Sequence, residues 1–240
     1  MSGHSKWATT KHKKAKTDAQ RSKIFTKIGR ELAIAVKIGG AEVENNPRLA
    51  MVMVKARANN MPNENISRSI KNAVGAGDKN SYEEVTYECY GPLGTAFIIS
   101  TLTDNKNRTA GEIRHIFDKC GGTMGTSGCV AYMFERKGVI VVEAGNKTED
   151  DFMMEALDLN VTDYKKDDDV FIAYLEPNNL SITTKAFEKI GYKILSSQIE
   201  MVPNTYIEID ENKDETIERL IEQLDDNEDV QEYFHNIEGF

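Results

Sequence analysis

The sequence has few cysteines and no long hydrophobic run, and both absences exclude classes of protein. Its three cysteines, Cys89, Cys120 and Cys129, are an odd number without the spacings of a secreted disulfide framework. No apolar run reaches the roughly 18 residues that a membrane span requires. Polar residues continue as far as Lys23, where a signal peptide would place its apolar stretch. We therefore expect a cytoplasmic protein that does not contact a membrane.

Common catalytic motifs are also absent. The sequence contains no Walker loop, HExxH, nucleophile elbow or CxxC motif. Residues 122–128 have GxxGxxG spacing, but they follow a predicted helix and lead into a predicted strand, the reverse of a dinucleotide fingerprint, so we interpret them as a connecting loop. His115 and the cysteines lack the close ligand pairs of a zinc site. We expect no enzymatic activity, no cofactor and no metal.

Charge is abundant and unevenly distributed. The chain has a net charge of -9, yet residues 1–72 hold 15 Lys/Arg and 5 Asp/Glu, a net of +10. Residues 73–240 hold 15 and 34, a net of -19. The first 23 residues contain seven Lys/Arg, one acid (Asp18) and the only tryptophan, Trp7. Such asymmetry indicates contact with nucleic acid or a membrane surface at one end of the chain.

The N-terminal third of the chain is predicted to be helical. From Lys23 to a stop at Gly39-Gly40, a core arc of apolar residues lies opposite a basic stripe that Ile34 interrupts. The arc comprises Ile24, Phe25, Ile28, Leu32, Ala35 and Val36, and the stripe comprises Lys23, Lys27, Arg30 and Lys37. A second helix is expected to begin at Asn46-Pro47 and a third near Asn63. Short loops between three amphipathic helices predict a small bundle.

After Lys79 the pattern changes to strands and helices. We predict strands at 85–89 and 95–102, a helix capped by Asn107 and a strand at 129–134. Residues 139–200 show the βαββαβ order of a ferredoxin-like unit, and a strand at 206–209, a helix through 217–224 and a strand at 230–234 follow. The predicted fold class is α+β, with an N-terminal three-helix domain and two ferredoxin-like α/β domains, one inserted in the other. The expected domains are 1–78, the discontinuous 79–136 with 203–240, and the insert 137–202.

The basic residues suggest a nucleic-acid interface. Lysines of the N-terminal arm can neutralise phosphates without a fixed fold, and a base can stack on Trp7. Lys106 and Arg108 flank a predicted helix N-terminus suited to an anion, although plain capping explains that segment equally well. The alternative for the arm is a solubilising tail whose Trp7 packs back on the bundle. The candidate residues are Lys6, Trp7, Lys11, Lys13, Lys14, Lys16, Arg21, Lys23, Lys27, Arg30, Lys106 and Arg108.

The segment 208–229 has the opposite character, with eleven acids and two basic residues. We interpret it as a solvated helix face. An acidic surface that keeps the basic arm away from non-specific sites is the alternative.

Several motifs together resemble the YebC family, which includes the mitochondrial translational activator of cytochrome c oxidase. They are GHSKW, KHKKAKTDAQRSKIFTK, NPRL, NNMP, YGP, LTDNKNRT and VAYMFERKGVI, and they span essentially the whole chain. The resemblance implies a helical N-terminal domain and two α/β domains, one inserted in the other. Cys89 and Leu93 stand where the family's pattern usually has glycine, and Cys129 stands where it usually has serine.

Two functions fit these observations. The resemblance implies either a transcriptional regulator that binds DNA or a translation factor that acts on ribosomal or transfer RNA and eases stretches such as consecutive prolines. None of the three predicted helices shows the polar face with which a recognition helix reads the major groove, which favours the ribosome. A scaffold that binds only proteins would leave the basic arm unexplained, and the sequence does not define an oligomeric state.

Overall fold

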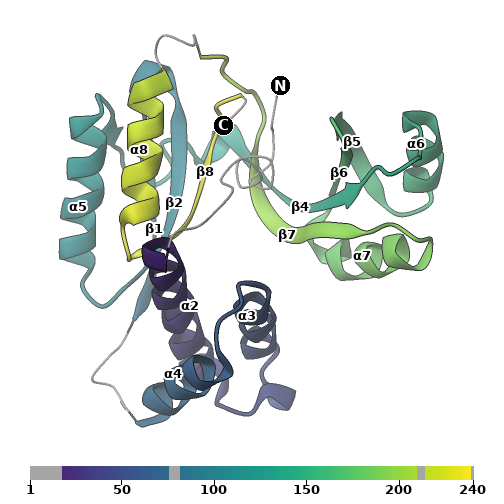
Figure 1. Ribbon diagram of the computed structural model, residues 1–240. Helices are drawn as coiled ribbons and strands as arrows, with labels where there is room; N and C mark the ends of the chain where they lie inside the picture. The colour runs from purple at the N-terminus through teal and green to yellow at the C-terminus, as the bar shows by residue number, and fades with distance from the viewer. Residues whose placement is uncertain (1–17, 76–81, 210–213, 239–240) are drawn as a thin grey trace.

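The computed structural model describes residues 18–75, 82–209 and 214–238, and its fold is α+β. Three N-terminal helices precede two four-stranded sheets, in which every strand pairing is antiparallel (Figure 1). The predicted fold class is confirmed. Within these ranges, no helix combines the length and the apolar character needed to cross a membrane.

The N-terminal helices α2 (Asp18–Gly39), α3 (Pro47–Ala58) and α4 (Asn63–Gly75) pack around one apolar core. Ile28 and Leu32 of α2 are buried there, as the helical spacing predicted, together with Leu49 of α3 and Ile66 of α4. Ile34 is buried as well, on the other side of α2. Both faces of this helix are therefore covered at that point.

Asn46 fixes the turn between α2 and α3. Its side chain accepts a hydrogen bond from the Leu49 amide at 3.0 Å, which confirms it as the N-cap of α3. The same side chain donates to the Ala35 carbonyl oxygen at 2.7 Å, so it also ties the end of α2 in place. A Cβ atom on Gly39 would lie 2.7 Å from the Asn46 side chain, and Gly40 has a φ of 82°. The predicted stop at these glycines thus has both a steric and a conformational reason.

The first sheet has the strand order β3-β1-β2-β8. Its strands are β1 (Glu83–Tyr90), β2 (Ala96–Thr103), β3 (Thr123–Met124) and β8 (Val230–His235), and helices α5 (Lys106–Lys119) and α8 (Asp214–Asp226) lie side by side against it (Figure 1). Phe97 of β2 and Phe117 of α5 meet edge to face with ring centroids 5.4 Å apart. Leu220 of α8 is fully buried in the same core.

The second sheet has the order β5-β6-β4-β7, as expected for a βαββαβ ferredoxin-like unit. It consists of β4 (Phe134–Glu143), β5 (Val161–Asp167), β6 (Val170–Leu175) and β7 (Ile194–Pro203), with α6 (Glu149–Leu157) and α7 (Leu180–Lys189). Phe152 of α6 stacks on Phe171 of β6 with ring centroids 4.3 Å apart. Phe187 of α7 belongs to the same buried cluster.

Two predicted strands are wrong. Residues 131–133 form a 3-10 turn, and the strand expected at 129–134 begins instead at Phe134 and continues as β4 to Glu143. The strand expected at 206–209 is reduced to an isolated bridge between Ile207 and Ile237. In both places an apolar stretch suggested a strand. The ladder with β7 begins only at Phe134, and Ile207 pairs with a single residue, Ile237.

The chain leaves the first sheet after β3, builds the second sheet and returns to the first with β8. This order is what an inserted domain would produce. The predicted boundaries at 136/137 and 202/203 stay a prediction, and they fall inside the β4–β7 ladder, which pairs Phe134 with Pro203.

Replacing Leu32 with alanine should destabilise the protein. Leu32 has no exposed surface, so the truncation should lower the free energy of unfolding by about 2–5 kcal/mol. Chemical denaturation measures the change. Met51→Ala on α3 is the control, because Met51 is 73% exposed and its truncation should leave stability nearly unchanged. Equal stability of Leu32→Ala and the wild type would contradict the assigned core.

Replacing Leu93 with glycine should stabilise the protein. Leu93 lies in the turn between β1 and β2 with a φ of 61°, a left-handed conformation that costs a non-glycine residue about 1–2 kcal/mol. Glycine removes this strain but loses more backbone entropy on folding, so the net gain should be about 0.5–1 kcal/mol. A melting curve should show a higher Tm for Leu93→Gly, and no rise for Leu93→Ala, which keeps the strain. A lower Tm for the glycine variant would show that the Leu93 side chain contributes more than its backbone costs.

Residues 134–203 should fold when expressed alone. The two terminal strands of this segment, β4 and β7, pair with each other along their length, and the segment has its own aromatic core. Circular dichroism should show mixed helix and strand with a cooperative thermal transition. A segment cut at the boundaries expected from the sequence, 137–202, removes the end of that ladder and should melt at a lower temperature. A disordered spectrum for 134–203 would show that the unit depends on the rest of the chain.

Candidate nucleic-acid interface

The predicted interface residues fall into two groups. Lys6, Trp7, Lys11, Lys13, Lys14 and Lys16 lie outside the described residues. Arg21, Lys23, Lys27 and Arg30 lie on α2, and Lys106 and Arg108 lie in the first turn of α5. Arg30 and Arg108 both pair with the carboxylate of Asp229. Lys106 pairs with Glu83 instead, and Lys23 pairs with Asp226.

The α2 stripe meets the C-terminal end of α8, and Figure 1 shows the two helices end to end. Lys23 Nζ lies 2.6 Å from Asp226 Oδ1, and Lys27 Nζ donates to the Asp225 carbonyl oxygen at 3.1 Å. The last turn of α8 has no basic residue of its own, although the negative end of the helix dipole favours cations there. The lysines of α2 therefore supply the positive charge that this helix end lacks.

Asp229, just beyond α8, lies at the centre of this contact. Arg30 Nη1 lies 2.5 Å from Asp229 Oδ1, and Arg108 Nη2 lies 2.9 Å from its Oδ2. The Thr109 hydroxyl donates to the same Oδ2 at 2.6 Å. Arg30 also donates to the Glu228 carbonyl oxygen at 2.6 Å, which fixes the guanidinium from a second side. One buried carboxylate thus joins α2, α5 and the start of β8.

The surroundings of Asp229 keep it ionised. Burial acts to raise the pKa of this carboxyl, but the hydrogen bonds from Arg108 and Thr109 and the charges of Arg30 and Arg108 outweigh burial and lower it. A lowered pKa in the folded state means that the stabilisation is fully present above the unfolded pKa. It is lost as the pH falls through the folded value, so this junction is intact at neutral pH.

The turn that precedes α5 is capped by Asn105, not by the predicted Asn107. The Asn105 side chain accepts from the Arg108 amide at 3.1 Å, and Asn107 lies within the first turn. Lys106 Nζ lies 2.5 Å from Glu83 Oε2, and Arg108 also lies 2.8 Å from Asp104. The described contacts account for this segment by capping and ion pairing. Anion binding by Lys106 and Arg108 stays a prediction.

Further ion pairs join the helices to the first sheet. Arg48 of α3 pairs with Glu84 of β1, and Lys55 of α3 lies 3.8 Å from Glu232 of β8. In these pairs, as in those at the end of α8, the cation belongs to the N-terminal helices and the acid to residues 82–238. The charge asymmetry of the sequence therefore helps to assemble the protein. Sequence reasoning considered the acidic segment as a solvated face or as a surface that keeps the basic arm away from non-specific sites, and it missed the acids at the end of α8 as partners of α2.

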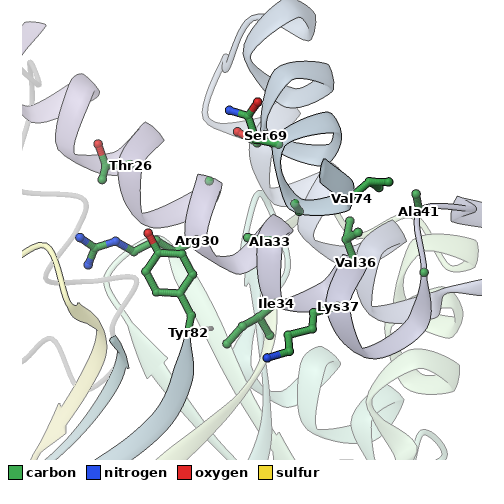
Figure 2. Close-up of a pocket in the computed structure, with 14 residues that line it drawn as sticks. Thr26, Arg30, Ala33, Ile34, Val36, Lys37, Ala41, Ser69, Val74 and Tyr82 are labelled. Carbon is green, nitrogen blue, oxygen red and sulfur yellow. The ribbon is translucent and has the colours of Figure 1, made fainter. Parts of the chain in front are cut away.

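A pocket of about 700 Å³ opens beside Arg30, between α2, α4 and Tyr82 (Figure 2). Gly29 and Ala33 of α2 line the pocket with small side chains, which leave it space. The Arg30 guanidinium carbon lies 5.6 Å from the centre of the Tyr82 ring. The described lining includes two cations, Arg30 and Lys37, and no carboxylate, but the Arg30 guanidinium already pairs with Asp229 and Glu228.

Helix α4 presents a polar face, although the expectation that no helix of the bundle reads base edges stays a prediction. Ser67, Arg68, Lys71 and Asn72 are exposed at positions that share one side of α4, next to the pocket. Residues 59–62 form the turn from α3 to α4, where Asn60 has a φ of 57°. A four-residue turn between two helices is typical of a helix-turn-helix motif. Sequence reasoning missed this face because the apolar positions of the helix, Ile66, Ile70 and Ala73, dominated its interpretation.

The loop after β3 is held by Glu88 of β1. Its carboxylate accepts from the amides of Gly128 at 2.6 Å and of Val130 and Ala131 at 2.8 Å. Burial acts to raise the pKa of this carboxyl, but the three backbone hydrogen bonds outweigh burial, and the net effect is a lowered pKa. In the part of the chain that the structure describes, no group of three or more His, Cys, Asp or Glu side chains could hold a metal ion.

Two family models match almost the whole chain. The N-terminal domain of the TACO1/YebC protein matches residues 5–76, and the TACO1/YebC second and third domain matches residues 82–237. A relative from Acetivibrio thermocellus is 53% identical over 100% of both chains, and one from Caldicellulosiruptor saccharolyticus is 50% identical over 99% of both. Each bears the name "Probable transcriptional regulatory protein".

The fold has a solved counterpart. The crystal structure of a conserved hypothetical protein from Aquifex aeolicus is 41% identical, covers 97% of this chain and 96% of its own, and superimposes with a TM-score of 0.82. Sequence motifs, family models and structure therefore agree, and the chain belongs to the TACO1/YebC family.

Proposed function

We propose that this protein is a non-enzymatic, nucleic-acid-binding regulator of gene expression that acts in the cytoplasm as a ribosome-associated translation factor. It would ease stalling at difficult sequences such as consecutive prolines. One observation carries the nucleic-acid part of the proposal: an acidic chain of net charge -9 begins with seven Lys/Arg and one acid in its first 23 residues. The regulatory names of the relatives support the broader role.

The arm and the pocket suggest how RNA would be held. Arm lysines such as Lys11, Lys13 and Lys14 would neutralise phosphates along an irregular backbone, and Trp7 would stack on an unpaired base. The pocket beside Arg30 is lined by Tyr82, a ring on which a base can stack, and by Lys37, while the Arg30 guanidinium is held by Asp229 and Glu228. Ribosomal RNA offers many unpaired bases of this kind.

A DNA-binding transcriptional regulator is the second candidate, and helix α4 favours it. Arg and Asn are side chains that read guanine and adenine edges in the major groove, and α4 exposes Arg68 and Asn72 on one face. The preceding turn gives α3 and α4 the order of a helix-turn-helix motif. The names of the relatives agree with this alternative.

Removing the arm should abolish most binding and leave the fold intact. We expect deletion of residues 1–17, which ends where α2 begins, to weaken binding to ribosomes or nucleic acid and to leave the Tm nearly unchanged. If about five arm cations meet phosphates, log affinity should fall with log salt at a slope of about -3.5 for single strands or -4.5 for duplex DNA, and the deletion should flatten it. A salt titration with purified ribosomes and duplex DNA measures both slopes.

Two variants separate the contributions within the arm. Replacing Lys11, Lys13 and Lys14 with glutamine should weaken binding to all sequences alike, because phosphate contacts carry no sequence information. Trp7→Ala should cost about 1–3 kcal/mol with little change in slope, because stacking releases no counterions. Stronger binding to duplex DNA than to ribosomes, lost in a sequence-dependent way with Arg68→Ala, would select the second candidate. Equal affinity and slope with and without the arm would contradict nucleic-acid binding by the arm.

A further inference from the structure

The contact between α2 and α8 places carboxylates where a nucleic acid would place phosphates. Lys23, Lys27 and Arg30 follow one another at spacings of four and three residues, so they share one side of α2. Opposite them lie Asp226, the Asp225 carbonyl oxygen and Glu228. All three cations are thus occupied by oxygen acceptors from the same protein.

The acids at this end of α8 conflict with the local rules of helix stability. Asp225 and Asp226 occupy the last turn of α8, where the helix dipole disfavours negative charge. Glu228 and Asp229 follow immediately, so four acids lie within five residues. Local stability therefore does not explain this cluster. Three of its carboxylates, those of Asp226, Glu228 and Asp229, pair with cations of α2, whereas the Asp225 carboxylate accepts a hydrogen bond from Tyr233 at 2.9 Å.

The ion pairs between α2 and the end of α8 differ in their exposure to solvent. The side chains of Lys23 and Asp226 are 36% and 69% exposed, and Glu228 is 58% exposed, so their ion pairs contribute little to stability. The Arg30–Asp229 pair is different, with side chains only 13% and 4% exposed. We call Lys23–Asp226 and Arg30–Glu228 the outer pairs, which are weak and exposed, and Arg30–Asp229 the inner pair, which is buried.

We propose that the acidic end of α8 covers a phosphate-binding face of α2, made by Lys23 and Lys27, and that nucleic acid displaces it. This inference rests on the proposed function and adds the regulation of the site. The outer pairs exchange at little cost, because phosphate oxygens replace carboxylate and carbonyl oxygens on the same lysines. The Arg30–Asp229 pair stays in place and keeps α2 joined to the first sheet.

Such a cover makes binding more selective. A short or weakly held ligand would not repay the loss of the α8 contacts, whereas a ligand already held by the arm would reach α2 at high local concentration. The arm and the α2 face are adjacent in sequence, so a ligand bound by the arm meets this face next.

The test compares two pairs of neutral variants on α8. Asp226→Asn with Glu228→Gln removes the outer carboxylates and keeps Asp229. Glu218→Gln with Glu222→Gln changes the net charge equally, at exposed positions of α8 that make no ion pair or hydrogen bond with described residues. The probes are a fluorescein-labelled 20-nucleotide single-stranded RNA and a 20-base-pair DNA duplex, titrated into the full-length protein at several salt concentrations.

We expect Asp226→Asn/Glu228→Gln to bind at least one probe about five- to tenfold more tightly. Its salt slope should steepen by about 0.7 to 0.9, because the substitutions remove the carboxylate partner of one lysine, Lys23, while the Asp225 carbonyl oxygen stays on Lys27. The control pair should change affinity less than twofold at 0.15 M salt, where exposed charges beyond about 8 Å are largely screened. Adding Lys23→Ala and Lys27→Ala should cancel the gain. Hydrogen exchange at residues 225–229 should also rise in the wild type when it is saturated with the RNA.

Three results would overturn the inference. Equal gains in the two variant pairs would show a general charge effect, and no gain in Asp226→Asn/Glu228→Gln would show that α8 covers nothing. A gain that survives the lysine substitutions would place the new contact elsewhere. In each of these cases a wild type that binds through its arm keeps the proposed function. If neither probe nor purified ribosomes bind the wild type, the proposed function fails and the inference fails with it.

Discussion

The arrangement of the N-terminal helices depends on one buried carboxylate, that of Asp229. It receives the guanidinium groups of Arg30 and Arg108 and the hydroxyl of Thr109, which come from two helices. A buried charge left without its partners costs several kcal/mol, so neither arginine can leave without a penalty. Apolar contacts define the core within each part of the protein, and this charged junction holds the helices against the first sheet.

Periodic patterns predicted the local structure well, and long-range pairing explains most of the errors. Helix α2 and strands β1 and β2 follow from the spacing of apolar residues alone. The strand at 129–134 was misplaced because β4 is defined by its ladder with β7, some sixty residues later in the chain. The choice of Asn105 over Asn107 as the cap of α5 has a similar origin. Thr103 and Thr109 share a hydrogen bond of 2.7 Å and Thr109 reaches Asp229, which sets where this helix begins.

The sequence predicted only one side of the contact between α2 and α8, and the site residues themselves stay a prediction. The cations of α2 were visible as a stripe, but their partners lie about 200 residues away in the sequence, where periodicity carries no information. One local irregularity did signal the contact. Asp225-Asp226 places negative charge at the C-terminal end of a helix, where the helix dipole disfavours it. Asp226 pairs with Lys23, so this unfavourable local charge indicated a partner elsewhere in the chain.

Under the proposed function, the charge of the protein has two uses that constrain each other. The net of -19 beyond residue 72 repels phosphates, which favours an approach of nucleic acid at the basic end of the chain. Part of that basic end is already neutralised by the same acidic region, through pairs that are mostly exposed to water and weakened by salt. Stronger acidic contacts would hold the helices more firmly but would leave fewer cations for a ligand. The inner Arg30–Asp229 pair is buried and joins α2 to the first sheet, whereas the outer pairs are exposed and are the ones that exchange in the proposed displacement.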